Sequence, residues 1–293
     1  MQFLLLCLIL AGFLAAKTRI VDENARSSLT DMVLNIFLPC TILASFFGTD
    51  PSELPSMGMM IIISLGIIIL SFMLSSVLYL KTGKDQRKVL FFATLIPNAS
   101  FIGIPLIESI YGAAALSYTA AYIIPLRAAL WSVGLAIFSG GKGNLKKIIF
   151  HPCMIATYLG LVILFTGFVP PEIISRLISS LGNCTTPISM MVVGCVLGQI
   201  KSKNLFTPLT IYFSFIRLIL IPLLVMGILL LIRPMPMITG VSVILAGTPA
   251  AVNTVILADK YGADKELASK IVFVSTLLSM LTIPALVWLF GLL

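Results

Sequence analysis

The sequence predicts an all-α membrane protein of ten transmembrane helices, arranged as two five-helix repeats of inverted topology. Of its 293 residues, 59% are hydrophobic and only 10% are charged, whereas about a quarter of the residues in soluble proteins are charged. The mean hydropathy is +1.13, and several apolar stretches approach or exceed the roughly 20 residues that cross a bilayer core. These observations exclude a soluble globular fold and predict a multi-pass protein of the cell membrane.

The ten helices are expected to follow one another through short loops, without a second folded domain. The apolar start of the chain is interpreted as the first span and not as a signal peptide, because Lys17 and Arg19 follow it instead of preceding it. Hydropathy and the positions of glycine, proline and charged residues predict helices at 3–17, 29–47, 56–80, 88–109, 113–139, 149–168, 172–200, 205–231, 237–260 and 264–291.

Lysine and arginine are distributed unevenly among the loops. Fourteen lie in the loops that follow the odd-numbered helices, for example Lys84 and Lys146, whereas the remaining loops contain only Arg176 and Arg233. The positive-inside rule then places the cation-rich loops in the cytoplasm and both termini on the non-cytoplasmic side. Because membrane orientation accounts for the net charge of +8, the lipid bilayer is an expected partner and nucleic acid is not.

An internal repeat of about 148 residues divides the chain into residues 1–148 and 149–293. The matching residues are asparagine, proline, glycine and tyrosine, and not the aliphatic residues that align by chance between apolar helices. The matched pairs are Asn35 with Asn183, Pro39 with Pro187 and Gly12 with Gly160, and, at an offset nearer 150, Tyr111 with Tyr261. Because five spans per half is an odd number, the second half enters the membrane from the opposite side, as in secondary transporters.

The fourth and ninth helices contain glycine and proline at mid-length, in the segments IPNASFIGIP (96–105) and AGTPAAVNT (246–254). Proline removes a backbone donor and clashes with the preceding turn, so both helices should be unwound there. Paired interruptions in two repeats indicate a midplane substrate site, and a plain proline kink with amide hydrogen bonds between helices is the alternative. The candidate site residues in these segments are Pro97, Asn98, Gly103, Pro105, Pro249 and Asn253, with the two asparagines as amide donors.

Both segments resemble the auxin efflux carrier family, which includes plant auxin exporters and bacterial malate-type permeases. The likeness covers residues 97–106 and 111–112 in the first half, and residues 249–254 and 258–262 in the second half, where the bacterial branch is closer. It extends to the inverted-repeat transporters of the bile acid, arsenite and sodium–proton antiporter type. The plant exporters carry a proline where this sequence has Thr254, so their substrate is not carried over.

The resemblance implies that the fourth and ninth helices cross at their broken midpoints and form a carboxylate site. It also implies a scaffold made of the first, second, sixth and seventh helices. The third to fifth and the eighth to tenth helices would then form a moving transport domain. A homodimer through the scaffold helices is a further expectation.

Arg127 and Arg217 each fall near the centre of a predicted span, where an arginine costs about 2.5 to 3.5 kcal/mol. A positive interior suits an anionic substrate, and the planar guanidinium matches a carboxylate. Two interpretations stay open for each arginine, namely contact with the substrate or neutralisation of the negative C-terminal end of a half-helix. Tyr122 is a candidate for lining the route to the site, with ordinary aromatic packing as the alternative.

Glu108 and Asp259 follow the two interrupted segments and are the candidates for coupling transport to protons or sodium. The alternative is that they cap helix ends or pair with loop lysines. His151 is interpreted as a solvated loop residue. No P-loop, metal-ligand cluster or nucleophile–base pair is recognised in the sequence, so no catalytic residue, cofactor or bound metal is expected.

These patterns favour a secondary transporter of a small organic anion, either a carboxylate such as malate or an auxin-like weak acid. It would work by alternating access around the midplane site. An anion channel or a ligand-sensing membrane receptor that uses the same site is the alternative. An intramembrane enzyme is not expected, since no catalytic constellation is recognised at membrane depth.

Overall fold

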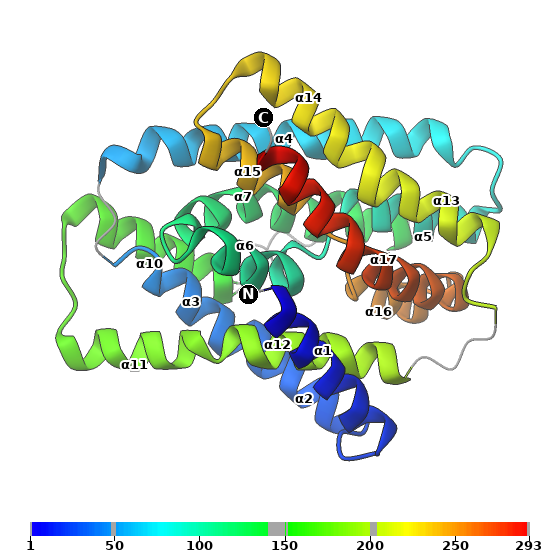
Figure 1. Cartoon of the computed structure of the whole chain (residues 1–293), viewed down its shortest axis with the longest axis horizontal. Coiled ribbons are helices and arrows are strands. Elements are labelled where there is room, and N and C mark those ends of the chain that lie inside the picture. Colours follow the sequence, from blue (N-terminus) through cyan, green and yellow to red (C-terminus); the bar gives the residue numbers. More distant parts are fainter. Residues whose placement is uncertain (1, 48–50, 140–149, 151, 200–203, 292–293) are drawn as a thin grey trace. The chain divides into compact units, whose positions relative to one another are not determined.

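The computed structural model describes residues 2–47, 51–139, 150, 152–199 and 204–291, and the regular elements in these ranges are helices (Figure 1). Six helical runs in the described ranges are long and apolar enough to cross a membrane, and four shorter apolar helices accompany them. The six runs are Glu23–Ala44, Leu54–Leu78, Ala115–Phe138, Glu172–Gly198, Pro208–Ile232 and Lys265–Gly291. The prediction of an all-helical membrane protein is confirmed, whereas the count of ten spans stays a prediction.

The chain forms two compact units, and each unit combines segments from both halves of the sequence. Unit 1 comprises residues 1–60, 100–124 and 146–200, and unit 2 comprises residues 61–99, 125–145 and 201–293. The helices of unit 1 are α1 (Gln2–Lys17), α2 (Glu23–Met32), α3 (Leu38–Ala44), α6 (Ile104–Tyr111), most of α7 (Ala115–Ala129), α10 (Pro152–Thr166), α11 (Glu172–Asn183) and α12 (Thr185–Gln199), with a 3-10 turn at Pro51–Glu53.

Unit 2 holds the other described helices. They are most of α4 (Leu54–Leu78), α5 (Lys84–Leu95), α8 (Leu135–Ser139), α13 (Pro208–Phe215), α14 (Ile221–Ile232), α15 (Pro236–Ala246), α16 (Asn253–Lys260) and α17 (Lys265–Gly291). The predicted division into a scaffold and a transport domain stays a prediction.

Four π-helical turns interrupt the described helices, and three of them end two residues before a proline. These three turns are Val33–Phe37 before Pro39, Ala99–Gly103 before Pro105 and Ile216–Leu220 before Pro222. A proline cannot donate to the carbonyl four residues earlier, and its ring crowds that carbonyl, so a wider turn removes the clash. The fourth turn, Leu130–Gly134, follows Pro125 inside α7.

Glycines allow the helices of unit 1 to approach closely. A Cβ atom on Gly12 of α1 would lie 2.0 Å from a backbone oxygen of α12, and a Cβ atom on Gly194 of α12 would lie 1.9 Å from a backbone oxygen of α1. A Cβ atom on Gly160 of α10 would likewise overlap the ring of Phe46. Gly160 lies 148 residues after Gly12, and Gly194 lies 148 residues after Phe46. The offset of the internal repeat therefore relates the close approach of α1 and α12 to the contact of Gly160 with Phe46. Close packing through small residues is typical of helices in lipid.

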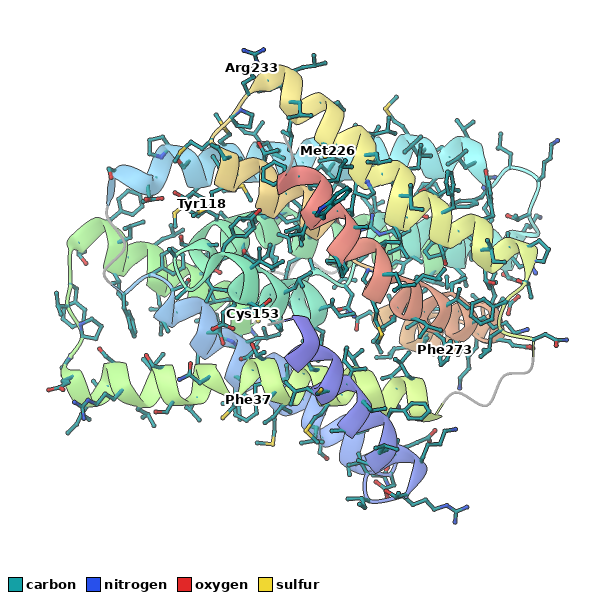
Figure 2. All side chains as sticks on the ribbon, viewed as in Figure 1. Phe37, Tyr118, Cys153, Met226, Arg233 and Phe273 are labelled. Atoms are coloured by element: carbon teal, nitrogen blue, oxygen red, sulfur yellow. The ribbon has the colours of Figure 1, made fainter. Side chains whose placement is uncertain are left out.

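The start of α2 differs from the prediction. The Asp22 carboxylate accepts a hydrogen bond from Ala25 N at 2.7 Å and caps the helix, which therefore begins at Glu23 and not at residue 29. In the same unit, the Cys153 thiol of α10 donates at 3.6 Å to the carbonyl oxygen of Leu34, which belongs to the π turn that also contains Phe37; Figure 2 labels Cys153 and Phe37.

In unit 2, α4 has the pattern of a helix that faces lipid. Its outer face carries large apolar side chains, with Ile62 70% and Val77 66% exposed, whereas Ser64, Ser71 and Ser75 are buried. A helix that faces water would have the opposite arrangement, with polar residues outside. Small polar residues on the inner face are typical of helix contacts in membranes.

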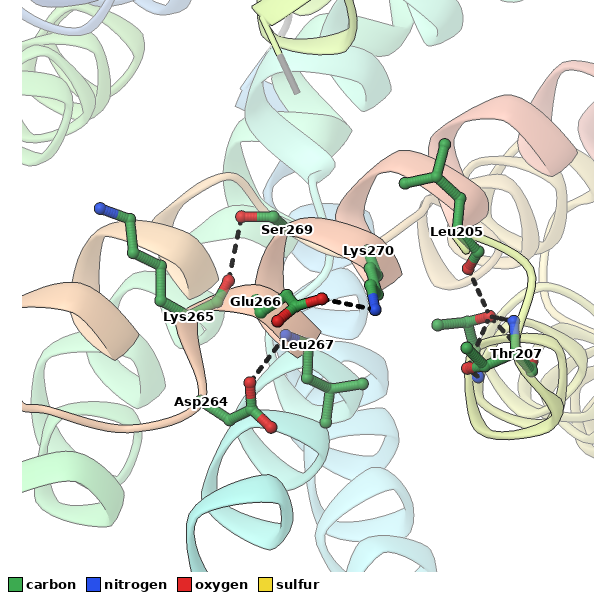
Figure 3. A network of polar contacts seen from close by, with 9 residues as sticks. Leu205, Thr207, Asp264, Lys265, Glu266, Leu267, Ser269 and Lys270 are labelled. Carbon is green, nitrogen blue, oxygen red and sulfur yellow. Dashed lines mark hydrogen bonds and ion pairs between the residues drawn. The ribbon is translucent and has the colours of Figure 1, made fainter. Parts of the chain in front are cut away.

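Polar side chains fix the starts of two helices of unit 2 (Figure 3). Asp264 Oδ1 accepts a hydrogen bond from Leu267 N at 2.8 Å in front of α17. Thr207 Oγ1 accepts one from Thr210 N at 3.2 Å in front of α13, and the Thr210 hydroxyl in turn accepts from Thr207 N at 2.8 Å. Such caps satisfy amide groups that have no acceptor within the helix.

Candidate functional site

The fourth predicted helix is divided at its middle. α5 ends at Leu95, and Ile96 adopts an extended backbone with φ −112° and ψ 97°. The chain returns to helical geometry through the π turn Ala99–Gly103 and then α6. Pro97 and Asn98 are buried, with Asn98 only 4% exposed.

The ninth predicted helix is divided at residues 247–252. α15 ends at Ala246, and the amide of Gly247 donates to the carbonyl oxygen of Val243 at 2.9 Å. A Cβ atom on Gly247 would lie 2.8 Å from Leu286 Cδ1 of α17, so glycine permits this close approach. The buried Thr248 hydroxyl donates to the carbonyl oxygen of Leu245 at 2.7 Å.

The two interruptions meet within unit 2. Asn98 N donates to the carbonyl oxygen of Pro249 at 2.8 Å, and Pro97 and Ala250 form an isolated antiparallel bridge. Ala250 N donates to the hydroxyl oxygen of Ser275 in α17 at 3.2 Å. Buried backbone groups that leave a helix need other partners, and here each segment supplies some of them for the other.

The first turn of α16 follows the second interruption and presents polar groups. The start of a helix carries the positive end of the helix dipole, and here the amides of Thr254 and Val255 donate to the carbonyl oxygens of Ala251 and Val252, at 3.0 Å each. Asn253, the first residue of α16, is half-buried. Thr254 is fully buried, and its hydroxyl has no hydrogen-bond partner in the described part of the chain. This turn is therefore suited to a small anion.

Arg217 lies in the π turn between α13 and α14 and is only 1% exposed. It interacts electrostatically with the buried phenol of Tyr79, whose hydroxyl is hydrogen-bonded to the Thr94 hydroxyl at 2.8 Å. Thr94 belongs to the last turn of α5, directly before the first interruption. The two interpretations of Arg217, contact with the substrate or neutralisation of a half-helix end, both stay predictions.

The other predicted site residues are divided between the units. Gly103, Pro105 and Tyr122 belong to unit 1 and are buried, and Tyr122 is fully so. Arg127 belongs to unit 2, two residues after Pro125, and is 6% exposed. Their grouping with Asn98 and Asn253 in one site stays a prediction.

The two candidate coupling acids have different surroundings. Glu108 is half-buried in α6, and its Oε2 accepts a hydrogen bond from the Thr186 hydroxyl of α12 at 2.8 Å. This contact is neither a helix cap nor a lysine pair. Asp259 lies near the end of α16, and its side chain is outside the described part of the structure. His151 is also outside the described residues.

Ser275, Tyr79 and Thr186 were not predicted as site residues. Each is a polar residue within or beside a long apolar helix, and several other serines and threonines have the same surroundings in the sequence. Only the three-dimensional contacts distinguish them. Thr254 did have a signal, since it stands where the plant exporters carry proline.

Comparisons with known proteins identify the family. A family model described as membrane transport protein matches the chain twice, over residues 2–147 and 141–288. A protein of Methanothermobacter thermautotrophicus, named as an uncharacterized transporter, is 26% identical over 285 residues, which cover 95% of this chain and 94% of the relative. A protein of Methanocaldococcus jannaschii with the same description is 25% identical over 302 residues, covering 97% of this chain and 96% of the relative.

A third relative carries a substrate in its name. It is a Rhizobium meliloti protein named as a candidate malonate transporter, 30% identical over 148 residues, which cover 50% of this chain and 46% of the relative. The bacterial malate-type branch stays a prediction. Because the family model accounts for nearly the whole sequence in two successive matches, the chain belongs to the membrane transport protein family.

Proposed function

We propose that this protein is a secondary carrier that moves a small carboxylate, such as malonate or malate, through the cell membrane. The observation that carries the proposal is the hydrogen bond from Asn98 N to Pro249 O, because it joins the interruptions of the two repeats at one point. Secondary transporters form their substrate sites where interrupted helices meet near the middle of the membrane. The name of the R. meliloti relative makes malonate the first substrate to test.

In this proposal the substrate carboxylate is held by neutral donors. The side chains of Asn98 and Asn253 and the hydroxyl of Thr254 donate to its oxygens, at the positive end of the α16 dipole. A hydrogen bond to a charged group contributes about 1.5 to 3 kcal/mol, so two or three such bonds give useful affinity. Neutral donors have a further advantage for a carrier. When the site is empty they leave no unpaired charge in the membrane, so the empty carrier can also change its conformation.

We further infer that α5–α6 and α15–α16 cross at this contact and that the site opens alternately to the two sides of the membrane. The proposal keeps both termini outside the cytoplasm and includes a homodimer through the predicted scaffold helices. A cysteine placed in loop 140–147, which lies outside the described residues, should then be labelled only from the cytoplasmic side. Labelling from outside would contradict this orientation.

The function is tested by flux into proteoliposomes that contain the purified protein. A panel of monocarboxylates and dicarboxylates, beginning with malonate and malate, is offered under imposed pH, sodium and voltage gradients. A carrier exchanges labelled malonate against unlabelled malonate trapped inside, and it accumulates the label transiently. Flux without such counterflow would indicate a channel, and binding without flux would indicate a receptor. Absence of both binding and flux for the whole panel would contradict a carboxylate substrate.

A further inference from the structure

Glu108 forms a contact that its position in the sequence did not predict. It is the fifth residue of α6, and its carboxylate accepts a hydrogen bond from the hydroxyl of Thr186 in α12 at 2.8 Å. Both residues belong to unit 1. The predicted span at 88–109 placed Glu108 at the end of a helix, close to the membrane surface.

The position of Thr186 along its helical run indicates how deep the Glu108 carboxylate lies in the membrane. Thr186 is the fifteenth residue of the 27-residue apolar run Glu172–Gly198. At 1.5 Å per residue, about 21 Å of helix precedes it and about 18 Å follows it. Glu108 therefore lies beside the middle of a helix long enough to cross the membrane. A carboxylate at this depth is costly and is commonly a proton-relay group.

Neighbouring hydrogen bonds fix the position of Thr186. The hydroxyl oxygens of Thr41 in α3 and Thr185 in α12 are 2.7 Å apart, and the Thr41 hydroxyl also donates to the carbonyl oxygen of Gly182 at 2.9 Å. These buried contacts fix the first turn of α12, from which Thr186 reaches Glu108. Glu108 itself is half-buried, so its side chain is not fully enclosed by the helices of unit 1.

Few titratable groups accompany Glu108 in the helices that pack against α6 within the described unit 1. In α12 the thiol of Cys195 donates to the carbonyl oxygen of Gly12 at 3.2 Å. In α1 the ammonium of Lys17 lies 5.5 Å from the ring centre of Phe13, and the Cys7 thiol is exposed. α6 adds Tyr111 at its end. The group that donates a hydrogen bond to the Glu108 carboxylate is the neutral hydroxyl of Thr186.

We propose that Glu108 is the proton-binding group that couples carboxylate transport to a proton gradient. This inference rests on the proposed carrier function and names its coupling ion. Protonation transfers H⁺ from water to a carboxylate oxygen of Glu108 and removes its negative charge, while the Thr186 hydroxyl keeps its own proton. A charge-assisted hydrogen bond is roughly twice as strong as a neutral one, so protonation weakens the link between α6 and α12. α6, which follows the first interruption through the π turn Ala99–Gly103, is then released to move.

Proton binding is tested first without any substrate. Infrared difference spectra of the purified protein are recorded between acidic and alkaline pH for the wild type, Glu108→Gln and Glu172→Gln. Glu172 is the matched control, because it is an exposed carboxylate at the start of the helical run that contains Thr186, and it pairs with Arg176. We expect one protonated-carboxyl band to be lost in Glu108→Gln and retained in Glu172→Gln. Identical spectra for the wild type and Glu108→Gln would overturn the proposal.

Coupling is tested next with labelled malonate in proteoliposomes. The wild type and Glu172→Gln should accumulate malonate in response to a pH gradient. Glu108→Gln should lose this accumulation entirely but keep malonate counterflow, which also shows that the variant is folded. Thr186→Val should remain coupled, because it removes the hydroxyl that contacts Glu108 and leaves the proton-binding carboxylate in place.

The possible results separate the two proposals. Accumulation driven by pH in Glu108→Gln, or by sodium alone in the wild type, would overturn the assignment of Glu108 and leave the carrier function intact. A Glu108-dependent infrared band in a protein that shows no malonate counterflow would support proton binding and contradict malonate transport.

Discussion

The two helix interruptions come from matching positions of the internal repeat, but they satisfy their backbone groups in different ways. In the first, only residues 96–98 leave the helix, and the Asn98 amide donates to a backbone carbonyl of the second. In the second, residues 247–252 leave the helix, and the Ala250 amide uses the hydroxyl of Ser275. Asn98 is 4% exposed, whereas Asn253 is half-buried. The first interruption thus mainly fixes the contact, and the second keeps groups available for a ligand.

This comparison predicts different effects of removing the two asparagines. Asn253→Ala should weaken malonate binding by roughly 10- to 150-fold with little change in stability, because a donor to a charged ligand is lost. Asn98→Ala should weaken binding and also lower the melting temperature, because a buried side chain is truncated. Malonate binding and thermal unfolding of both variants check this, with Asn24→Ala on the exposed face of α2 as the control. Equal melting temperatures for the two variants would contradict the different roles assigned to the two interruptions.

Loss of the Ser275 hydroxyl should destabilise the second interruption. Ser275→Ala leaves the Ala250 amide without its acceptor, at a cost of about 1 to 3 kcal/mol in the free energy of unfolding. Ser279→Ala is the matched control, since Ser279 is buried one turn further along α17 and its hydroxyl donates within its own helix. If thermal unfolding shows equal losses of stability for Ser275→Ala and Ser279→Ala, the hydrogen bond from Ala250 to Ser275 does not stabilise the second interruption.

Substitutions of Arg217 test whether its charge stabilises the carbonyl end of α5, just before the first interruption. If its charge offsets the α5 carbonyl end, Arg217→Lys should be tolerated, and Arg217→Gln should lose up to about 2 kcal/mol of stability without a change in malonate affinity. Arg233→Gln, at the exposed end of α14, should lose less stability, because solvent screens its charge, and should leave malonate affinity unchanged. A loss of affinity in Arg217→Lys would instead indicate a bidentate contact with the substrate.

Thr254 should give the smallest change in stability. Its buried hydroxyl has no hydrogen-bond partner in the described residues, so Thr254→Val should leave the melting temperature equal or slightly higher, by up to about 1 kcal/mol in unfolding free energy. Thr248→Val should lose about 1 kcal/mol, because the Thr248 hydroxyl donates to Leu245. A clear destabilisation of Thr254→Val would show that its hydroxyl is already satisfied. If that hydroxyl contacts the substrate, malonate affinity falls in the same variant.

Local chemistry explains what the sequence could predict. Composition establishes a helical membrane protein, and proline and glycine account for the places where α5 and α15 end, because their effect on the backbone is local. The start of α2 at Glu23 was missed because the capping carboxylate of Asp22 precedes a polar turn that hydropathy does not recognise as helical. Asp22 followed by Glu23 is a cap signal that could have been used.

Tertiary contacts explain what the sequence could not predict. Ser275 and Ser279 are equivalent in sequence terms, yet only Ser275 reaches another segment. The depth of Glu108 depends on which residue of α12 it meets, and a hydropathy profile holds no such information. The electrostatic interaction of Arg217 with Tyr79 likewise joins two segments that are far apart in the chain.

A double-mutant cycle measures most directly whether the two interruptions hold one substrate. The dissociation constants of malonate are determined for the wild type, Asn98→Ala, Asn253→Ala and the double variant. If both side chains bind the same carboxylate, the effects should be non-additive, with a coupling energy of about 1 kcal/mol or more. Effects that add within about 0.5 kcal/mol, or wild-type affinity in the double variant, would contradict a shared site.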